Sequence, residues 1–177
     1  MKEFELKNGN KIPALGLGTS GLRGEECTQV VKEALELGYR QIDTADMYQN
    51  HQAIAEALNE SDVKRDDLFI TSKIQSKDLE YKQLKKTADR LLSELELEYF
   101  DLLLIHWPSP EIPVAESLKA MKELKEAGKA KNIGVSNFTI PLLKEALAAY
   151  PDLITVNQVE FHPVSYTHLT LPTNREV

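Results

Sequence analysis

The sequence predicts an α/β protein in which strands and helices alternate, and two observations support this fold class. Strand-like apolar runs recur along the chain, with a helical segment between each run and the next. Some runs are apolar at every position, as in residues 102–105 (LLLI), which is typical of parallel strands covered on both faces. Alternation of this kind predicts right-handed βαβ units and a parallel sheet. We therefore expect either a doubly wound sheet or an incomplete (β/α)₈ TIM barrel.

The expected elements follow one another in a regular order. An N-terminal hairpin is predicted over residues 3–12, with its turn at Asn8 and Gly9. About six strands should follow, over residues 14–18, 39–43, 68–73, 100–107, 132–137 and 153–161. Five helices should lie between them, over residues 25–37, 51–59, 79–95, 113–127 and 139–150. Asn50 and Thr139 stand where helix N-caps are expected.

Composition narrows the classes of partner. The chain has 177 residues, 42% of them hydrophobic, which is enough for one domain with a sizeable core. Its net charge of −7 argues against nucleic acid and anionic membranes as partners. No apolar run approaches the roughly 20 residues of a membrane helix, and the N-terminus lacks a signal-peptide core, so we expect a cytoplasmic protein. Cys27 is the only cysteine, and we expect no metal site.

Polar side chains stand at the carboxyl ends of successive predicted strands. They are Asp43, Lys73, His106, Ser136, Asn137 and Gln158. In a barrel these strand ends meet on the face where active sites lie. Each residue alone also has a structural explanation, such as a solvated lysine, a core histidine or a capping aspartate, and Tyr48 could be a packed aromatic. The equivalent placement on consecutive units favours a common site.

The chemistry of these side chains is complementary. Lys73, paired with Asp43, would lower the pKa of the Tyr48 phenol and make it a usable acid. His106 could donate a hydrogen bond to a substrate carbonyl. A proton donor beside a carbonyl, without a metal, suits reduction by a hydride donor. The amide and hydroxyl groups at the last strand ends suit a carboxamide such as that of nicotinamide.

Six stretches of the chain resemble the aldo-keto reductase family, in particular its bacterial 2,5-diketo-gluconate reductase-like branch. The stretches are LGLGT at 15–19, DTADMY at 43–48, ITSK at 70–73, DLLLIHWP at 101–108, IGVSNF at 133–138 and VNQVEFHP at 156–163. Members of this family are NADPH-dependent (β/α)₈ barrels that reduce aldehydes and ketones to alcohols. The resemblance implies a catalytic tetrad of Asp43, Tyr48, Lys73 and His106, with Tyr48 as the proton donor.

The same resemblance implies the binding residues. NADPH would be bound by Gly18, Thr19, Asp43, Ser136, Asn137 and Gln158, and a small-molecule carbonyl substrate by Tyr48, His106 and Trp107. The full-length parent would be a cytoplasmic monomer. Two positions depart from many relatives: Ser20 replaces an aromatic residue, which should open the pocket wall, and His51 replaces a glutamate, with little expected effect on catalysis.

A competing motif lies in the first strand. Residues 16–21 (GLGTSG) satisfy the G-x-G-x-x-G fingerprint of a Rossmann fold, and Asp43 follows at a suitable distance. This interpretation leaves Tyr48, Lys73 and His106 without roles. It also needs a helix that starts at Gly21, whereas the helical pattern begins after Gly24. We therefore favour the barrel.

The resemblance to the family stops after residue 164. We expect residues 1–164 to form a partial barrel, and residues 165–177 (SYTHLTLPTNREV) to be a non-native tail that looks like translated adaptor or vector sequence. Two further hypotheses follow. The chain could be a catalytically inactive truncated fragment, or the barrel could serve as a cofactor-sensing binding module.

Overall fold

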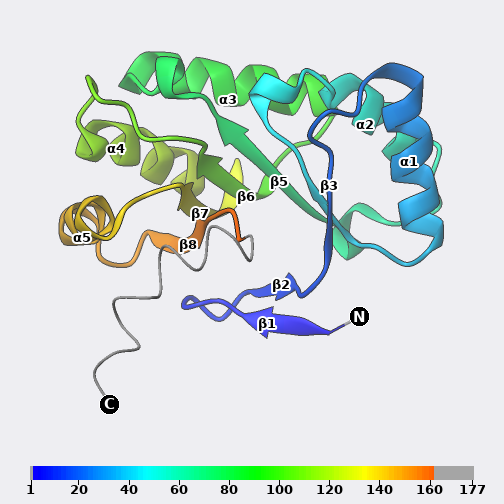
Figure 1. Cartoon of the computed structure of the whole chain (residues 1–177), viewed down its shortest axis with the longest axis horizontal. Coiled ribbons are helices and arrows are strands. Elements are labelled where there is room, and N and C mark those ends of the chain that lie inside the picture. The colour runs from blue at the N-terminus through cyan, green and yellow to red at the C-terminus, as the bar shows by residue number, and fades with distance from the viewer. Residues whose placement is uncertain (1, 162–177) are drawn as a thin grey trace.

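A computed structural model describes residues 2–161, in which six parallel strands form one curled sheet (Figure 1). The strands are β3 (Gly16–Gly18), β4 (Gln41–Asp43), β5 (Phe69–Ile74), β6 (Phe100–Ile105), β7 (Ala130–Ser136) and β8 (Ile154–Gln158). They pair side by side in sequence order, from β3 to β8. A doubly wound sheet would reverse its strand order part-way, so this order confirms the partial (β/α)₈ barrel.

Five helices cover the outer face of the sheet (Figure 1). They are α1 (Gly24–Glu36), α2 (His51–Asn59), α3 (Tyr81–Leu95), α4 (Val114–Glu126) and α5 (Ile140–Ala149). All five predicted helices are present, with ends within two residues of those expected. The start of α1 at Gly24, rather than at Gly21, agrees with the rejection of the Rossmann motif.

Three short 3₁₀ turns were not expected from the sequence. They are η1 (Asp46–Tyr48), η2 (Arg65–Asp67) and η3 (Ser76–Asp78). The capping prediction was wrong in its chemistry: Asn50 and Thr139 occupy N-cap positions, but neither side chain makes a capping hydrogen bond. Asn50 is instead buried and bonds elsewhere, as described below.

The predicted N-terminal hairpin is present as an antiparallel pair, β1 (Glu3–Glu5) and β2 (Lys11–Pro13). Its connection turns at Gly9, whose φ of +82° favours glycine. The side-chain amides of Asn8 and Asn10 both donate to the Asn132 side-chain oxygen of β7, at 2.8 and 2.9 Å. The hairpin therefore lies against the amino-terminal end of the sheet and leaves the carboxyl ends for a site (Figure 1).

Side chains alternate between the two faces of the central strands and so contribute to two separate hydrophobic clusters. On β5, Ile70 and Ile74 pack in the large core between sheet and helices, whereas Phe69 packs with Leu102 and Leu104 in a small cluster on the concave face. Lys73 has the same parity as Phe69, so the pleat places it on the concave face as well. The interior of the half-barrel is therefore apolar at its base and polar at the carboxyl ends of the strands.

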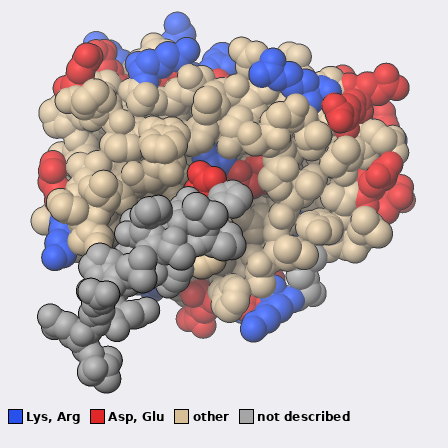
Figure 2. Space-filling model, viewed as in Figure 1, with Lys and Arg blue, Asp and Glu red and all other residues tan. Residues whose placement is uncertain are grey.

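Charged side chains of both signs gather around the periphery of the molecule in the view of Figure 2. No helix among residues 2–161 is long and apolar enough to cross a membrane. The same residues hold no cluster of three or more side chains suited to a metal ion. The predicted domain boundary at 164 and the predicted tail, 165–177, lie outside the described residues.

Candidate active site

The centre of the site is an ion pair between the ends of two neighbouring strands. Lys73 on β5 is buried, with 2% of its side chain exposed, and its Nζ pairs with Oδ1 of Asp43 at the end of β4. The same ammonium donates to the Thr44 carbonyl at 2.9 Å. An ammonium can be buried only when it is paired and hydrogen bonded, and the two partners here supply both. Parallel pairing of β4 and β5 brings the pair together.

Tyr48 and His106 complete the predicted tetrad. Tyr48 ends the turn η1, and the Lys73 Nζ lies 5.2 Å from the centroid of its ring. His106 follows β6 directly and meets the Tyr48 ring edge-on, with centroids 5.7 Å apart and planes at 84°. The His106 backbone N–H donates to the Ile74 carbonyl at 2.9 Å, which continues the β5–β6 ladder by one residue. The structure thus gathers all four side chains at one edge of the sheet.

Burial sets the direction of the pKa shifts of Tyr48, His106 and Lys73. The pKa of Tyr48 is raised, first by burial and then by the negative charge of Asp43. The net direction is opposite to the lowering expected from Lys73, because burial disfavours the phenolate and the charge of Asp43 opposes that of its paired lysine. The pKa of His106 is lowered, first by burial and then by the charge of Lys73. Burial also lowers the pKa of Lys73, against the opposing effect of Asp43.

The residues predicted to bind the cofactor flank this centre. Gly18 on β3 pairs with Asp43, and a Cβ added to Gly18 would meet no atom within 4 Å. Thr19 is buried and donates to the Asp43 carbonyl through both its backbone N–H and its hydroxyl, each at 3.0 Å. The Gln158 amide, at the end of β8, donates to Oδ2 of Asp43 at 2.8 Å. This edge therefore presents open space beside the acid and amide groups around it.

Ser136 and Asn137 lie at the end of β7 on the same edge. Asn137 adopts a left-handed conformation with φ of +61°, which asparagine tolerates better than most residues. Its amide donates to the His106 carbonyl and to the Ser136 hydroxyl oxygen, both at 3.0 Å. Polar groups from five successive strand ends are thus linked around the Asp43–Lys73 pair.

Comparison with known proteins decides the family. Residues 14–173 match the aldo/keto reductase family. The chain belongs to this family. It is 46% identical over 155 residues to methylglyoxal reductase DkgB of Salmonella typhi, a match that covers 86% of this chain and 58% of that protein. The chain therefore spans less than two thirds of the length of this relative.

Solved structures of aldo/keto reductases agree in fold. A protein assigned as 2,5-diketo-D-gluconic acid reductase B superposes with a TM-score of 0.88 and 35% identity, over 97% of this chain and 63% of the other. A Bombyx mori aldo-keto reductase in complex with NADP gives a TM-score of 0.85 and 29% identity, over 97% and 63%. Both likenesses agree with the resemblance drawn from the sequence motifs.

Two further residues of this aldo/keto reductase chain, Ser20 and Trp107, follow site residues directly in the sequence and are exposed. Trp107, predicted to contact substrate, follows His106 and is 54% exposed. Ser20 is exposed, as a more open wall would require. Its interaction with the Tyr48 side chain lowers the pKa of Tyr48, against the larger effect of burial. The sequence showed that Ser20 was unusual but gave no sign of this contact.

The hydrogen bonds of Asn50, which hold the loop around Tyr48, were also not predicted from the sequence. Asn50 is 2% exposed; its side-chain oxygen accepts from the Thr44 hydroxyl at 2.6 Å, and its amide donates to the carbonyls of Thr19 and Leu22. These bonds tie the Tyr48 loop to the loop after β3. The pattern had marked Asn50 as a helix cap, and only the tertiary contact reveals its role.

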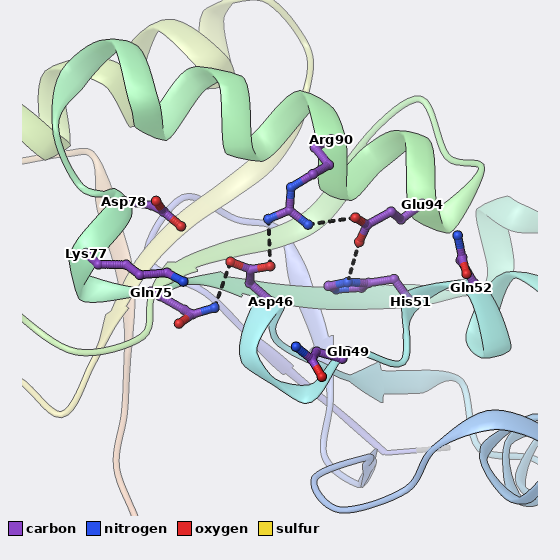
Figure 3. A pocket seen from close by; sticks show the side chains of 9 residues that line it. All are labelled: Asp46, Gln49, His51, Gln52, Gln75, Lys77, Asp78, Arg90 and Glu94. Carbon is purple, nitrogen blue, oxygen red and sulfur yellow. Dashed lines mark hydrogen bonds and ion pairs between the residues drawn. The ribbon is translucent and has the colours of Figure 1, made fainter.

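On its other side the Tyr48 loop borders an open pocket of about 410 Å³ (Figure 3). Its lining includes Asp46, His51, Gln75, Arg90 and Glu94, but no member of the tetrad. His51 is 2% exposed, and its Nε2 lies 3.0 Å from the Ser72 hydroxyl. Its Nδ1 lies 3.2 Å from Oε2 of Glu94, outside hydrogen-bonding geometry. His51 is thus a buried neighbour of this loop, in contact with an ion-pair cluster.

Proposed function

We propose that these residues belong to an NADPH-dependent reductase of aldehydes and ketones, in which Tyr48 gives a proton to the carbonyl oxygen as the alcohol forms. The observation that carries this proposal is the assembly of Asp43, Tyr48, Lys73 and His106 at the carboxyl ends of three neighbouring strands. Barrel enzymes place their active sites at this end.

The raised pKa of Tyr48 keeps its hydroxyl protonated at neutral pH. The phenol therefore holds a proton that it can deliver. An alkoxide is a stronger base than a phenolate, so the transfer is favourable even from a weakly acidic phenol. Lys73 lies close enough to the Tyr48 ring for its positive charge to stabilise the phenolate left behind. Asp43 and the Thr44 carbonyl hold the ammonium in place.

His106 would orient the substrate. Its lowered pKa keeps the imidazole neutral at neutral pH, so that one ring nitrogen carries a proton and can donate to the carbonyl oxygen. Its Nδ1 is buried without a hydrogen-bond partner among residues 2–161. The contact between the Tyr48 and His106 rings supports a role for both as donors to one substrate oxygen.

The residues present fit a nicotinamide cofactor. NADPH, when bound, supplies the hydride. The open space at Gly18 leaves room beside Asp43, and the hydroxyl and amide groups of Ser136, Asn137 and Gln158 offer the donors and acceptors that a carboxamide needs. The Bombyx mori relative in complex with NADP supports this assignment.

The substrate that we propose is a small carbonyl compound such as methylglyoxal, with Trp107 against it at the mouth of the site. The name of the Salmonella typhi relative, methylglyoxal reductase, supports this choice. The negative net charge and the single cysteine suit our further proposal of a monomer that acts in the cytoplasm, without nucleic acid or membrane partners.

The test is carbonyl-dependent oxidation of NADPH, followed at 340 nm, by a polypeptide that contains residues 1–161 within a complete barrel. We expect turnover of methylglyoxal. Binding of NADPH without turnover of any aldehyde or diketone would overturn the proposal and favour a cofactor-sensing module. The 177-residue chain assayed in parallel tests the hypothesis of an inactive fragment, which turnover would refute.

A further inference from the structure

The turn that carries Tyr48 is held from outside the active site. Tyr48 is the last residue of η1, and Asp46 is the first. Asp46 is 7% exposed, and its two carboxylate oxygens take one donor each: Arg90 Nη2 to Oδ1 at 2.7 Å and Gln75 Nε2 to Oδ2 at 2.9 Å. A buried carboxylate with two fixed donors has little freedom to move.

The two donors come from rigid elements. Arg90 lies on α3, where its other terminal nitrogen, Nη1, donates to Glu94 at 2.6 Å (Figure 3). Gln75 follows β5 directly, two residues after Lys73. The carboxylate of Asp46 is thus hydrogen bonded both to helix α3 and to the segment directly after β5, the strand that carries Lys73.

The geometry points to Arg90 and Gln75 as positioning residues, which act through Asp46 to fix the η1 turn and with it the Tyr48 hydroxyl relative to Lys73 and His106. Their importance for catalysis rests on the proposed function, because Tyr48 must reach the carbonyl oxygen. A displacement of about 1 Å at a reacting group can lower a rate by about a hundredfold. The Asp46 contacts restrain the start of this turn, and the Asn50 contacts restrain the residues after it.

Hydrogen exchange on the 177-residue chain tests the structural step without any need for activity. The backbone N–H groups of Tyr48 and Gln49 bond the carbonyls of Ala45 and Asp46, at 2.9 and 3.3 Å, and report on the turn. In Arg90→Met we expect the peptide spanning residues 44–50 to exchange about tenfold faster, the factor for losing one charge-assisted hydrogen bond at a buried carboxylate. Gln75→Leu, which removes no charge, should show a smaller change at the same peptide.

Lys85→Met is the matched control. Lys85 also lies on α3 and makes an ion pair to a neighbouring element, with Glu123 of α4 at 2.7 Å, but it does not contact η1. This variant should leave exchange at residues 44–50 unchanged. Unchanged exchange there in both Arg90→Met and Gln75→Leu would overturn the proposal, as would acceleration spread evenly along the chain, which indicates a general loss of stability.

The catalytic step is tested in the complete barrel. We expect Arg90→Met to lower kcat for methylglyoxal about tenfold or more, with little change in KM, and Arg90→Lys to recover part of the loss. Arg90→Lys keeps the charge but offers a single nitrogen in place of two. A local exchange effect with unchanged kcat would overturn the positioning role. If the wild-type barrel reduces no carbonyl, the proposed function fails, and exchange still decides whether these residues hold the turn.

Discussion

At the scale of single residues, burial is the largest influence on the pKa values of Tyr48, Lys73 and His106. The sequence predicted the four tetrad residues, and the structure brings them together. It did not predict the direction of the Tyr48 pKa, because that depends on how deeply the ring is packed and on the charge that Asp43 keeps beside it. Position in a βα repeat can be read from a sequence, whereas the degree of burial of one hydroxyl cannot.

The buried histidines predict how stability depends on pH. The pKa values of His51 and His106 are both lowered, chiefly by burial. Below the ordinary histidine pKa of about 6.5, the unfolded chain binds protons that the folded chain does not, so folding loses stability as pH falls. We expect the free energy of unfolding in urea to fall between pH 7.5 and 5.5.

The variant His51→Gln isolates one of the two groups. Glutamine does not titrate and can still hydrogen bond the Ser72 hydroxyl. The loss of stability on acidification should therefore be smaller than in the wild-type chain. An equal or greater loss would show that the negative charges of Glu94 and Asp46 offset the effect of burial on the charged form of His51.

At the scale of elements, sequence patterns located every strand and helix among residues 2–161 but not the three 3₁₀ turns between them. The 3.6-residue apolar pattern of α3, for example, is set by the residues that it buries, such as Leu84, Ala88 and Leu91. The turn η1 has no such pattern, because Asp46 and Asn50 fix it through contacts with distant segments. Local sequence does not encode those contacts in a form that a pattern can reveal.

One glycine controls the spacing of two strands. A Cβ at Gly134 would lie 2.6 Å from Cδ2 of Leu104 and 2.7 Å from the Val156 backbone oxygen. The side chain can shift, but the backbone oxygen belongs to β8 and can move only with its strand. We expect Gly134→Ala to reduce the free energy of unfolding by about 1–3 kcal/mol, as overpacking in a core does. Urea denaturation measures this change.

Gly18→Ala provides the control for stability, because a Cβ there meets no atom within 4 Å. Its unfolding free energy should stay within about 0.5–1 kcal/mol of the wild-type value, the range for a glycine replaced in regular structure. Equal destabilisation by the two alanines would contradict the close approach of β8 to Gly134.

At the scale of the whole molecule, the order of the strands explains why one edge of the sheet holds all four residues of the proposed tetrad. Each βα unit adds one strand beside the last, so chemical groups about 30 residues apart in the sequence become neighbours in space. Alternation alone left a doubly wound sheet open, and the strand order from β3 to β8 decides for the barrel. The chain spans 58% of its Salmonella typhi relative, so the activity of the whole protein is a separate experimental question.

The central claim is that Tyr48 gives the proton to the carbonyl. Its most direct test compares Tyr48→Phe with the wild-type sequence in a complete barrel, by single-turnover reduction of methylglyoxal with NADPH bound. Phenylalanine preserves the ring contacts with His106 and removes only the hydroxyl. We predict a reduction rate about 10²–10⁴-fold lower, the usual contribution of a general acid, with NADPH affinity nearly unchanged. A rate that survives the substitution undiminished would contradict the account.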